Sequence, residues 1–562
     1  MDSKKIKLGL LSFVMIIVIL AAGFLLFKDK NKPVQETVVT KIDRFELLTN
    51  RNHNLPFDVT CTVTEDTITA VLPSGLDLSG VVADFTFTGE KVLVNGTEVI
   101  SGTTALDFSK PIELTLQGKD ENSKTIKADI HSIDTGLPTV SIVTEDPDDE
   151  INKKDYSEAE FFIGGGNADS CYYAMGEKES LEVSCGIKGR GNSTWGHPKK
   201  SYTLKLEDKT PLLDMAESKD WALVANYEDY SLLRNYIAAY LGEVAEQEYV
   251  MKVRPVDTFL NGEYIGTYTL TEKIEIDENR LNITEFDENK SIDQVGYLLE
   301  FDAHVMEEIA PNGKVRGRDP GNWKQYGWMK TDHLYYNPET DETFFPIDIG
   351  GKWCTIKKPS TKNLTAEHGE YIYRMVTEAV QSLKEYNYDE VSKRIDIESF
   401  VKWYIVEEYM NNADSSMHSS VYMYLDVNGK LTLGPMWDFD RSAGNCDYWN
   451  YPKESVYDLM ESGAGWFRYL FQMLEPRKLL EEEWTKFNDG ISDLDTKIDE
   501  WANMIADSAN HNFRTWNILG TKVASNPIEI VSAKTFEEQV AFLKEWLGKR
   551  KVAMDNFIQT LY

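Results

Sequence analysis

Cysteine is scarce in this chain. Five cysteines are spread over 562 residues, and no two of them stand in a Cys-x-x-Cys arrangement. This spacing argues against a structural zinc site and against a disulfide-rich scaffold. A single disulfide between Cys171 and Cys185 stays open as a pairing within one domain. The eight histidines show no metal-binding spacing, and no Gly-x-Ser-x-Gly sequence marks a serine hydrolase.

Basic side chains are fewer than acidic ones in this chain. Lysine and arginine total 59 residues, aspartate and glutamate total 93, and the net charge is −34. Such a chain does not bind nucleic acid non-specifically, so we expect no nucleic-acid partner. Hydrophobic residues make up 42% of the chain, which is enough to fill substantial cores. The length predicts roughly two to four domains.

A long uncharged run stands near the N-terminus. Residues 8–27 carry no charged side chain, and lysines flank the run on both sides. Twenty helical residues span about 30 Å, the thickness of the hydrocarbon core of a bilayer. We predict that residues 1–32 form a cytoplasmic tail and a transmembrane signal anchor. The protein would then be a single-pass protein of the cell membrane with its bulk extracytoplasmic; a cleavable signal peptide is the alternative.

Short apolar runs with regular turns fill residues 38–135. FDVTCTVTEDTITAVLP alternates around an acidic turn, and VLVNGTEVI contains an Asn-Gly turn. This pattern of short apolar runs and turns predicts a small, immunoglobulin-like β-sandwich. No residues in this region suggest a catalytic site, so we interpret the region as a spacer or a binding module.

The most informative stretch runs from residue 396 to residue 445. Asp396 is a helix cap, and apolar residues then recur at helical spacing until about Asn411. Two apolar runs follow, separated by Asn428-Gly429, which predicts a tight hairpin with both turn residues at positive φ. The hairpin would bring together three carboxylates that are distant in sequence: Asp414, Asp438 and Asp440.

Clustered carboxylates are tolerated where a cation neutralises them or where one of them holds a proton. Magnesium suits such a place, because it takes one or two protein carboxylates and completes its shell with water and phosphate oxygens. A further aspartate can accept the proton of an attacking hydroxyl. The other interpretation is an ordinary surface hairpin flanked by two aspartates.

A basic, glycine-containing segment lies upstream. Arg190-Gly-Asn-Ser-Thr-Trp195 is followed by Lys199, Lys200 and Lys205. Glycine lets backbone amides approach a phosphate, and the cationic side chains supply countercharge. A strand edge protected by lysines is the alternative. In the next helical stretch, Arg234 and Asn235 lie off the apolar stripe, so we expect both to be solvated; the alternative is that they face a site.

A series of motifs in one order resembles the CotH spore-coat kinase family. The resemblance covers the chain from about Leu137 to near the C-terminus. The motifs that carry it are Arg190–Trp195, Pro198-Lys-Lys200, Trp221–Tyr230 with Leu233-Arg-Asn235, Gly262–Tyr268 with Glu272, and Pro435-Met-Trp-Asp-Phe-Asp440.

The resemblance implies an α+β fold, with an atypical protein-kinase-like bilobal domain over residues 137–562. It implies an extracytoplasmic enzyme that uses ATP with Mg²⁺ or Mn²⁺ to phosphorylate Ser or Thr of surface or coat proteins. Asp414 would be the catalytic aspartate, and Asp438 and Asp440 would bind the metal. The implied nucleotide-binding residues are Arg190, Asn192, Lys200, Lys205 and Glu272.

Other functions stay open. A metal-dependent glycosyltransferase could use Asp438-x-Asp440 to clamp a nucleotide sugar. A surface adhesin or pseudokinase would keep the scaffold without catalysis. Paired-carboxylate glycoside hydrolysis needs a sugar cleft, and no motif in the sequence marks one.

Overall fold

The computed structural model describes most of the chain after residue 39. The described residues are 40–118, 122–166, 180–302, 333–337, 341–350, 352–415, 417, 419–447, 455–457, 459–463 and 465–561. They divide into two compact units, one within residues 1–130 and one that contains residues 131–562 together with residues 53–58 and 71–77. The predicted membrane anchor at residues 8–27 lies outside the described residues. Within the part that is described, no helix is both long and apolar enough to cross a membrane.

The first unit consists of strands, as its alternating sequence predicts. Its sheets have the strand orders β2-β1-β6, β3-β4-β11-β10-β7-β8 and β5-β9. The aromatic side chains of Phe45, Phe85 and Phe108 pack together in its core. The strands are β1 Lys41–Leu47, β2 Val59–Thr60, β3 Thr62–Val63, β4 Thr67–Leu72, β5 Val81–Val82, β6 Asp84–Thr88, β7 Lys91–Val94, β8 Thr97–Glu98, β9 Ala105–Leu106, β10 Ile112–Gln117 and β11 Ser123–Ser132.

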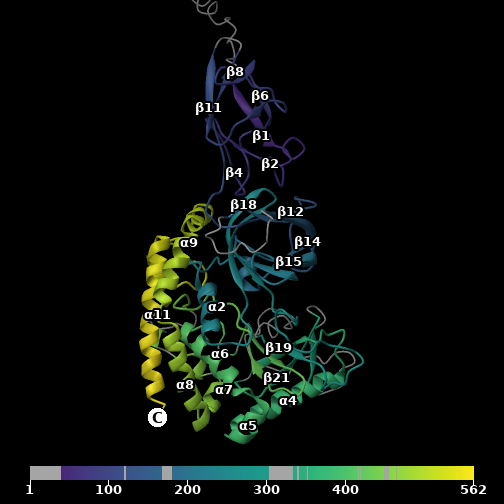
Figure 1. Cartoon of the computed structure of the whole chain (residues 1–562), viewed down its shortest axis with the longest axis vertical. Coiled ribbons are helices and arrows are strands. Elements are labelled where there is room, and N and C mark those ends of the chain that lie inside the picture. Colours follow the sequence, from purple (N-terminus) through teal and green to yellow (C-terminus); the bar gives the residue numbers. More distant parts are fainter. Residues whose placement is uncertain are drawn as a thin grey trace, which may run out of the picture. The chain divides into compact units, whose positions relative to one another are not determined.

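The second unit begins with a closed barrel (Figure 1) in the order β12-β13-β14-β15-β16-β18-β17. Strand β12 closes the barrel by pairing in parallel with β17. Residues 266–272 of β18 are buried without interruption, because one face fills the barrel and helix α9 (Leu494–Thr515) covers the other. The strands are β12 Thr139–Thr144, β13 Ser157–Gly164, β14 Ser180–Arg190, β15 Ser201–Thr210, β16 Ser218–Val224, β17 Val253–Leu260 and β18 Glu263–Glu272.

A six-stranded antiparallel sheet and a set of helices follow the barrel. The sheet has the order β20-β21-β22-β19-β23-β24. Its strands are β19 Tyr297–Phe301, β20 Tyr335–Asn337, β21 Glu342–Ile347, β22 Lys352–Lys358, β23 Val421–Leu425 and β24 Thr432–Leu433. The helices are α2 Arg234–Val244, α4 Ala366–Lys384, α5 Tyr388–Arg394, α6 Ile397–Met410, α7 Gly465–Leu470, α8 Leu474–Gly490, α9 Leu494–Thr515, α10 Ile528–Ser532 and α11 Phe536–Gln559.

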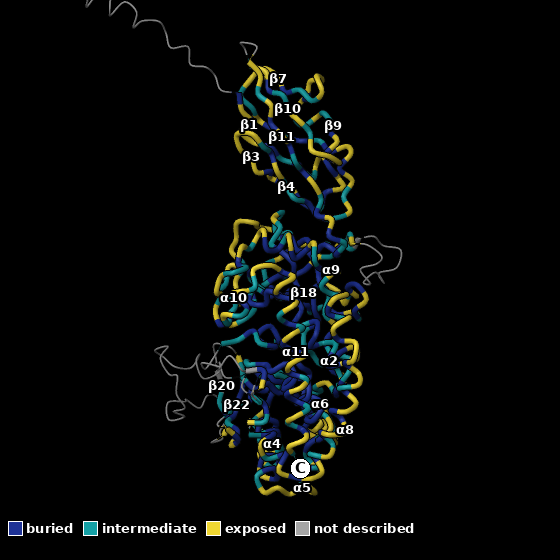
Figure 2. Tube along the Cα trace, turned by 90° about the vertical axis from the view of Figure 1, so that its left-hand side faces the viewer, coloured by how far each residue is buried: buried dark blue, intermediate teal, exposed yellow. Residues whose placement is uncertain are grey.

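Helix α6 lies in the middle of this region, where buried residues predominate (Figure 2). It begins as predicted, because the Asp396 carboxylate accepts the backbone N–H of Ser399 at 3.3 Å. It ends at Asn411, whose φ of 47° lies in the left-handed region. The helix therefore delivers the chain directly to the segment that carries Asp414.

The predicted hairpin is present, but its turn is different. Strands β23 and β24 pair with Met423 opposite Leu433. The backbone N–H of Gly429 donates to the carbonyl of Asp426, so the central turn residues are Val427 and Asn428 rather than Asn428 and Gly429. Only Asn428 needs the left-handed conformation in this turn, with a φ of 52°.

The α+β class is confirmed, whereas the kinase-like bilobal arrangement stays a prediction. The first part of the expected catalytic domain is a closed barrel, and the rest is the six-stranded sheet with its helices. Hydrophobic cores fill the barrel and the sheet–helix region separately. The polar residues discussed below come from both parts.

A buried ion pair fastens the C-terminal helix α11 to α6. The Arg550 and Glu408 side chains are both fully buried, and Nη2 lies 2.8 Å from Oε1. We expect Arg550→Met to lower the free energy of unfolding by about 3–5 kcal/mol, because it leaves the Glu408 charge buried without its cation. Urea denaturation measures this change. The matched control is Lys549→Met, since the adjacent lysine is 53% exposed and its pairing with Glu545 contributes little; equal losses in the two variants would contradict the expectation.

Candidate active site

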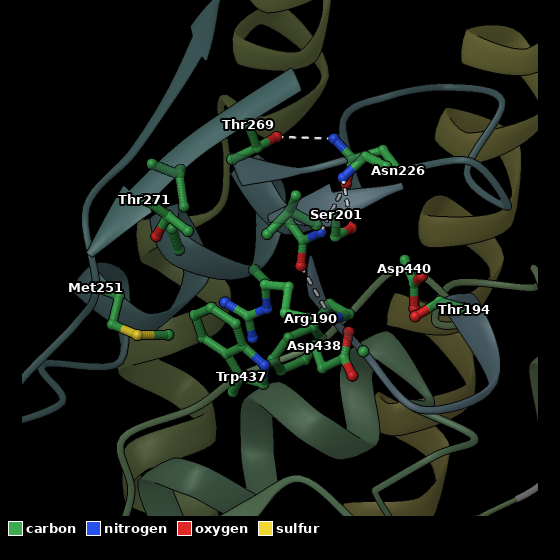
Figure 3. A pocket seen from close by; sticks show the side chains of 18 of the residues that line it. Arg190, Thr194, Ser201, Asn226, Met251, Thr269, Thr271, Trp437, Asp438 and Asp440 are labelled. Atoms are coloured by element: carbon green, nitrogen blue, oxygen red, sulfur yellow. Dashed lines mark hydrogen bonds between the residues drawn. The ribbon is translucent and has the colours of Figure 1, made fainter. Parts of the chain in front are cut away.

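A cleft opens where the barrel meets α2 and the segment 436–440 (Figure 3). It encloses about 950 Å³ of empty space, including its solvent-facing part. Polar and apolar residues both line the cleft; the polar ones include Arg190, Thr194, His197, Lys199, Asn226, Glu228, Asn235, Asp438 and Asp440, and the apolar ones include Val224, Ala225, Ala238, Ala239, Val250, Met251, Val253 and Met436.

The structure brings the three predicted aspartates together. Burial raises the pKa of Asp414, Asp438 and Asp440, although the charge of Arg441 opposes the rise at all three. The rise is largest at Asp440, where the charges of Asp438, Glu228 and Asp414 add to the effect of burial. Asp438 also takes a positive φ of 67°. Mutual repulsion of this kind is relieved by a proton or by a bound cation.

A chain of amides fixes the backbone between Asp438 and Asp440. Asn235 on α2 accepts the backbone N–H of Phe439 at 3.0 Å. Its own amide donates to Asn226 at 3.1 Å, and Asn226 donates to Thr269 on β18 at 2.7 Å. The acidic segment is therefore held by hydrogen bonds that reach into the barrel wall.

Arg441 connects Asp414 to a second carboxylate. Its Nη1 lies 3.1 Å from Oδ2 of Asp414, and its Nε and Nη2 donate to Glu228 at 2.9 Å and 2.7 Å. His197 contacts the same Glu228 carboxylate at 2.7 Å. Burial would raise the pKa of Glu228, but the hydrogen bonds from His197 and Arg441 lower it overall. Glu228 is therefore an anion between two cationic or donor groups.

Arg190 is the cation that the cleft leaves available. Its guanidinium stacks on the Trp437 ring at 4.7 Å and interacts with the charge of Asp438, as Figure 3 illustrates. Within the described residues, no hydrogen bond or ion pair to a protein group engages this guanidinium. Burial lowers the pKa of Arg190, and the charge of Asp438 partly offsets that change. A planar, unpaired guanidinium in a cleft is suited to an anionic ligand.

The predicted nucleotide-binding residues do not all reach the cleft. Lys205 is exposed on β15, and Lys200 donates to the carbonyl of Trp195, so neither lines the cleft. Asn192 is exposed beside it. Glu272 is buried and accepts the Tyr249 hydroxyl and the Lys252 backbone N–H, behind the lining.

Lys199 is the lysine that lines the cleft. Its ammonium donates to the carbonyl of Thr267 at 2.5 Å and to Asn512 at 2.8 Å. Burial lowers the pKa of Lys199 well below its ordinary value, although the charge of Asp257 opposes the effect. Both hydrogen-bond acceptors are neutral, and within the described part of the chain no carboxylate contacts the ammonium directly.

The described residues contain no group of three or more His, Cys, Asp or Glu arranged to hold a metal by themselves. Magnesium needs no such group when phosphate oxygens complete its shell. The raised pKa values of Asp438 and Asp440 are the state that a cation would relieve. These two carboxylates therefore fit a metal bound together with a phosphate ligand.

Several site residues escaped prediction from the sequence. Glu228, Arg441 and His197 stand in or beside the recognised motifs, but no spacing rule links residues 213 positions apart. The prediction that Arg234 and Asn235 are solvated is wrong. Arg234 is fully buried and paired with Asp229, and Asn235 lines the cleft, because the segment after Asp440 covers this face of α2.

Comparison with known proteins identifies the region that contains the cleft. The model of a family described as CotH kinase protein matches residues 187–554. No curated protein matches the chain. A crystal structure from Bacteroides thetaiotaomicron, described as that of a proposed glycoside hydrolase, is 17% identical over 31% of this chain and 54% of its own, with a TM-score of 0.14. This chain thus spans about half the length of that protein, and a likeness at this TM-score carries no argument about fold or activity.

Proposed function

Because the chain belongs to the CotH kinase protein family, we propose that it transfers the γ-phosphoryl group of ATP, in the presence of Mg²⁺ or Mn²⁺, to Ser or Thr of a surface or coat protein. The observation that carries the proposal is the pairing of an unengaged guanidinium, that of Arg190, with buried carboxylates in one cleft. The guanidinium suits phosphate and the carboxylates suit a metal. The proposal includes the extracytoplasmic, membrane-anchored location that residues 8–27 predict.

The roles of the residues follow from their positions. Arg190 and Lys199 would offset the charge of the phosphates, and the apolar side chains around Met251 would pack against the nucleoside. Asp414, whose raised pKa makes it a better proton acceptor than an ordinary aspartate, would take the proton of the acceptor hydroxyl. Phosphoryl transfer depends mainly on such positioning and charge neutralisation.

The metal would be held by Asp438 and Asp440. When bound, it would neutralise charge on the phosphate oxygens of the nucleotide. Without it, burial raises the pKa of both carboxylates and the charge of Asp438 raises the pKa of Asp440 further, so metal affinity should fall as the pH is lowered.

The direct test incubates the full chain with γ-labelled ATP and either Mg²⁺ or Mn²⁺, and then maps modified Ser, Thr and Tyr by mass spectrometry. Metal-dependent incorporation into the chain or into an added protein supports the proposal. Transfer of a sugar from a nucleotide sugar instead would establish the glycosyltransferase alternative. Failure to bind any nucleotide would favour a non-catalytic surface scaffold.

Arg190 allows a sharper test of the phosphate site. We expect Arg190→Gln to weaken ATP binding by about 10-fold or more, because a charge-assisted hydrogen bond contributes about 1.5–3 kcal/mol. Isothermal titration calorimetry with a non-hydrolysable ATP analogue measures the change.

Lys200→Gln is the matched control for Arg190→Gln. Lys200 is a nearby cation whose ammonium is engaged by the Trp195 carbonyl and does not line the cleft. Its replacement should leave the affinity nearly unchanged. A larger loss from Lys200→Gln than from Arg190→Gln would reverse the assignment.

A further inference from the structure

Glu228 receives an unusually complete set of partners for a carboxylate in the cleft. The residue is 1% exposed. Its Oε2 accepts Nε of Arg441 at 2.9 Å, and its Oε1 accepts Nη2 of Arg441 at 2.7 Å. Oε1 also lies 2.7 Å from Nε2 of His197. The two bonds to Arg441 form the fork that fixes a guanidinium in both position and plane.

The fork limits what Arg441 can offer to Asp414. The nitrogen that contacts Asp414 is Nη1, which lies 3.1 Å from Oδ2 and 3.5 Å from Oδ1 of Asp414. This contact is longer than the bonds to Glu228. Arg441 therefore orients the Asp414 carboxylate without pairing with it fully, and Asp414 retains acceptor capacity for another group.

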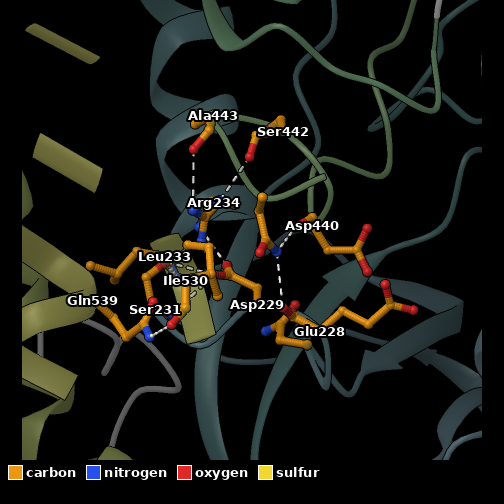
Figure 4. A network of polar contacts seen from close by, with 12 residues as sticks. Glu228, Asp229, Ser231, Leu233, Arg234, Asp440, Ser442, Ala443, Ile530 and Gln539 are labelled. Atoms are coloured by element: carbon orange, nitrogen blue, oxygen red, sulfur yellow. Dashed lines mark hydrogen bonds and ion pairs between the residues drawn. The ribbon is translucent and has the colours of Figure 1, made fainter. Parts of the chain in front are cut away.

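Hydrogen bonds also hold the backbone of the segment that carries Glu228 (Figure 4). Its backbone carbonyl accepts the side-chain amides of Asn445 and Asn526, both at 2.9 Å. The neighbouring Asp229 pairs with Arg234, and that guanidinium donates to the carbonyls of Ser442 and Ala443 at 2.8 Å and 3.2 Å. The segment that carries Glu228 is thus fastened to the residues that directly follow Arg441.

From this geometry we propose that Glu228 is a positioning residue. It holds Arg441 so that Nη1 faces Asp414, and it thereby keeps the Asp414 carboxylate available to accept the proton of the acceptor hydroxyl. This inference rests on the proposed function. Loss of the Glu228 carboxylate would remove the fork that fixes the plane of the Arg441 guanidinium, which could then present both terminal nitrogens to Asp414. Such a two-nitrogen pair would take a lone pair on each Asp414 oxygen and stabilise the ionised form, which weakens Asp414 as a base.

The test is the variant Glu228→Gln in the full chain, assayed for phosphoryl transfer at varied ATP concentration with Mg²⁺. We expect kcat to fall about 10- to 100-fold, the range that misplacement of a catalytic group produces. The KM for ATP should stay within about threefold of the wild type, because the nucleotide contacts are unchanged. Glu228→Asp keeps the charge and should recover part of the lost kcat.

A second variant and a control separate positioning from simple loss of structure. Arg441→Lys keeps the charge but cannot form the fork, so it should show the same split between kcat and KM. Glu408→Gln is the matched control, since Glu408 is also a fully buried carboxylate paired with an arginine but is not among the residues that line the cleft. It should lower the midpoint of thermal unfolding and leave both kinetic constants of the folded protein unchanged.

Distinct results would overturn the inference. A rise in the KM for ATP with unchanged kcat, or loss of Mg²⁺-dependent nucleotide binding in Glu228→Gln, would make Glu228 a nucleotide or metal ligand instead. Equal kcat in wild type, Glu228→Gln and Arg441→Lys would remove any positioning role. Absence of transfer in the wild-type protein would reject the proposed function, and with it the basis of this inference.

Discussion

Replacing Asp414 with Asn is expected to lower the rate of phosphoryl transfer by about 10²–10⁴-fold, the contribution of a general base, while ATP binding is nearly unchanged. Asn has almost the shape of Asp but cannot accept a proton. Asp414 stands outside the set of residues that line the cleft, and its side chain is still 26% exposed, so an acceptor can approach it. Single-turnover kinetics with pre-bound ATP measures the transfer step alone.

The control for Asp414→Asn is Asp447→Asn. Asp447 lies only a few residues beyond the acidic segment and pairs with Lys522 in a solvent-exposed ion pair. That variant should transfer phosphate at the wild-type rate. If Asp414→Asn retained the wild-type rate as well, another group would have to take the proton, and the assignment of Asp414 would be wrong.

Asp438→Asn is expected to act on binding instead. We expect the affinity for ATP in Mg²⁺ to fall by more than about 100-fold, since even groups behind a metal ligand contribute about 10- to 100-fold to metal affinity. Asp438 lines the cleft, and its carboxylate interacts with the positive charge of Arg190. Calorimetric titration with ATP, once in Mg²⁺ and once in EDTA, separates the metal-dependent part of the affinity from the rest.

The EDTA titration is an internal control for Asp438→Asn. Because Arg190 and Lys199 are retained, the metal-independent affinity should be equal in the variant and in the wild type. The gain in affinity from Mg²⁺ should be much smaller in the variant than in the wild type, because Asp440 alone remains to hold the metal. Equal affinity of wild type and Asp438→Asn in Mg²⁺ would refute the metal assignment.

Local signals in the sequence were enough to predict the parts that carry the aspartates. The Asp396 cap and the apolar spacing place α6 almost to the residue, and the hairpin follows from two apolar runs around a turn. Because antiparallel strands return to their starting point, the proximity of Asp414 to Asp438 also follows from the local sequence. These features depend on contacts between residues close in the chain.

The missed features depend on register and on distant contacts. Lys199 and Lys200 are adjacent residues just before β15, and the fold buries the first while it leaves the second half-buried. The sequence does not tell which of the two faces the cleft. The bond of Arg441 to Glu228 joins residues 213 positions apart, and only the assembled fold brings them together.

The cover that α9 provides for β18 has a consequence for biosynthesis. The amide of Asn512 satisfies both the Lys199 ammonium and the Thr267 backbone N–H, although it follows Thr267 by 245 residues. A nascent chain that has emerged only as far as the last barrel strand would leave those donors facing water and the apolar side chains of β18 uncovered. Nearly the whole protein must leave the ribosome before α9 can cover β18. We therefore expect stalled or prematurely terminated chains to be recognised by chaperones rather than to accumulate as a stable, partly folded protein.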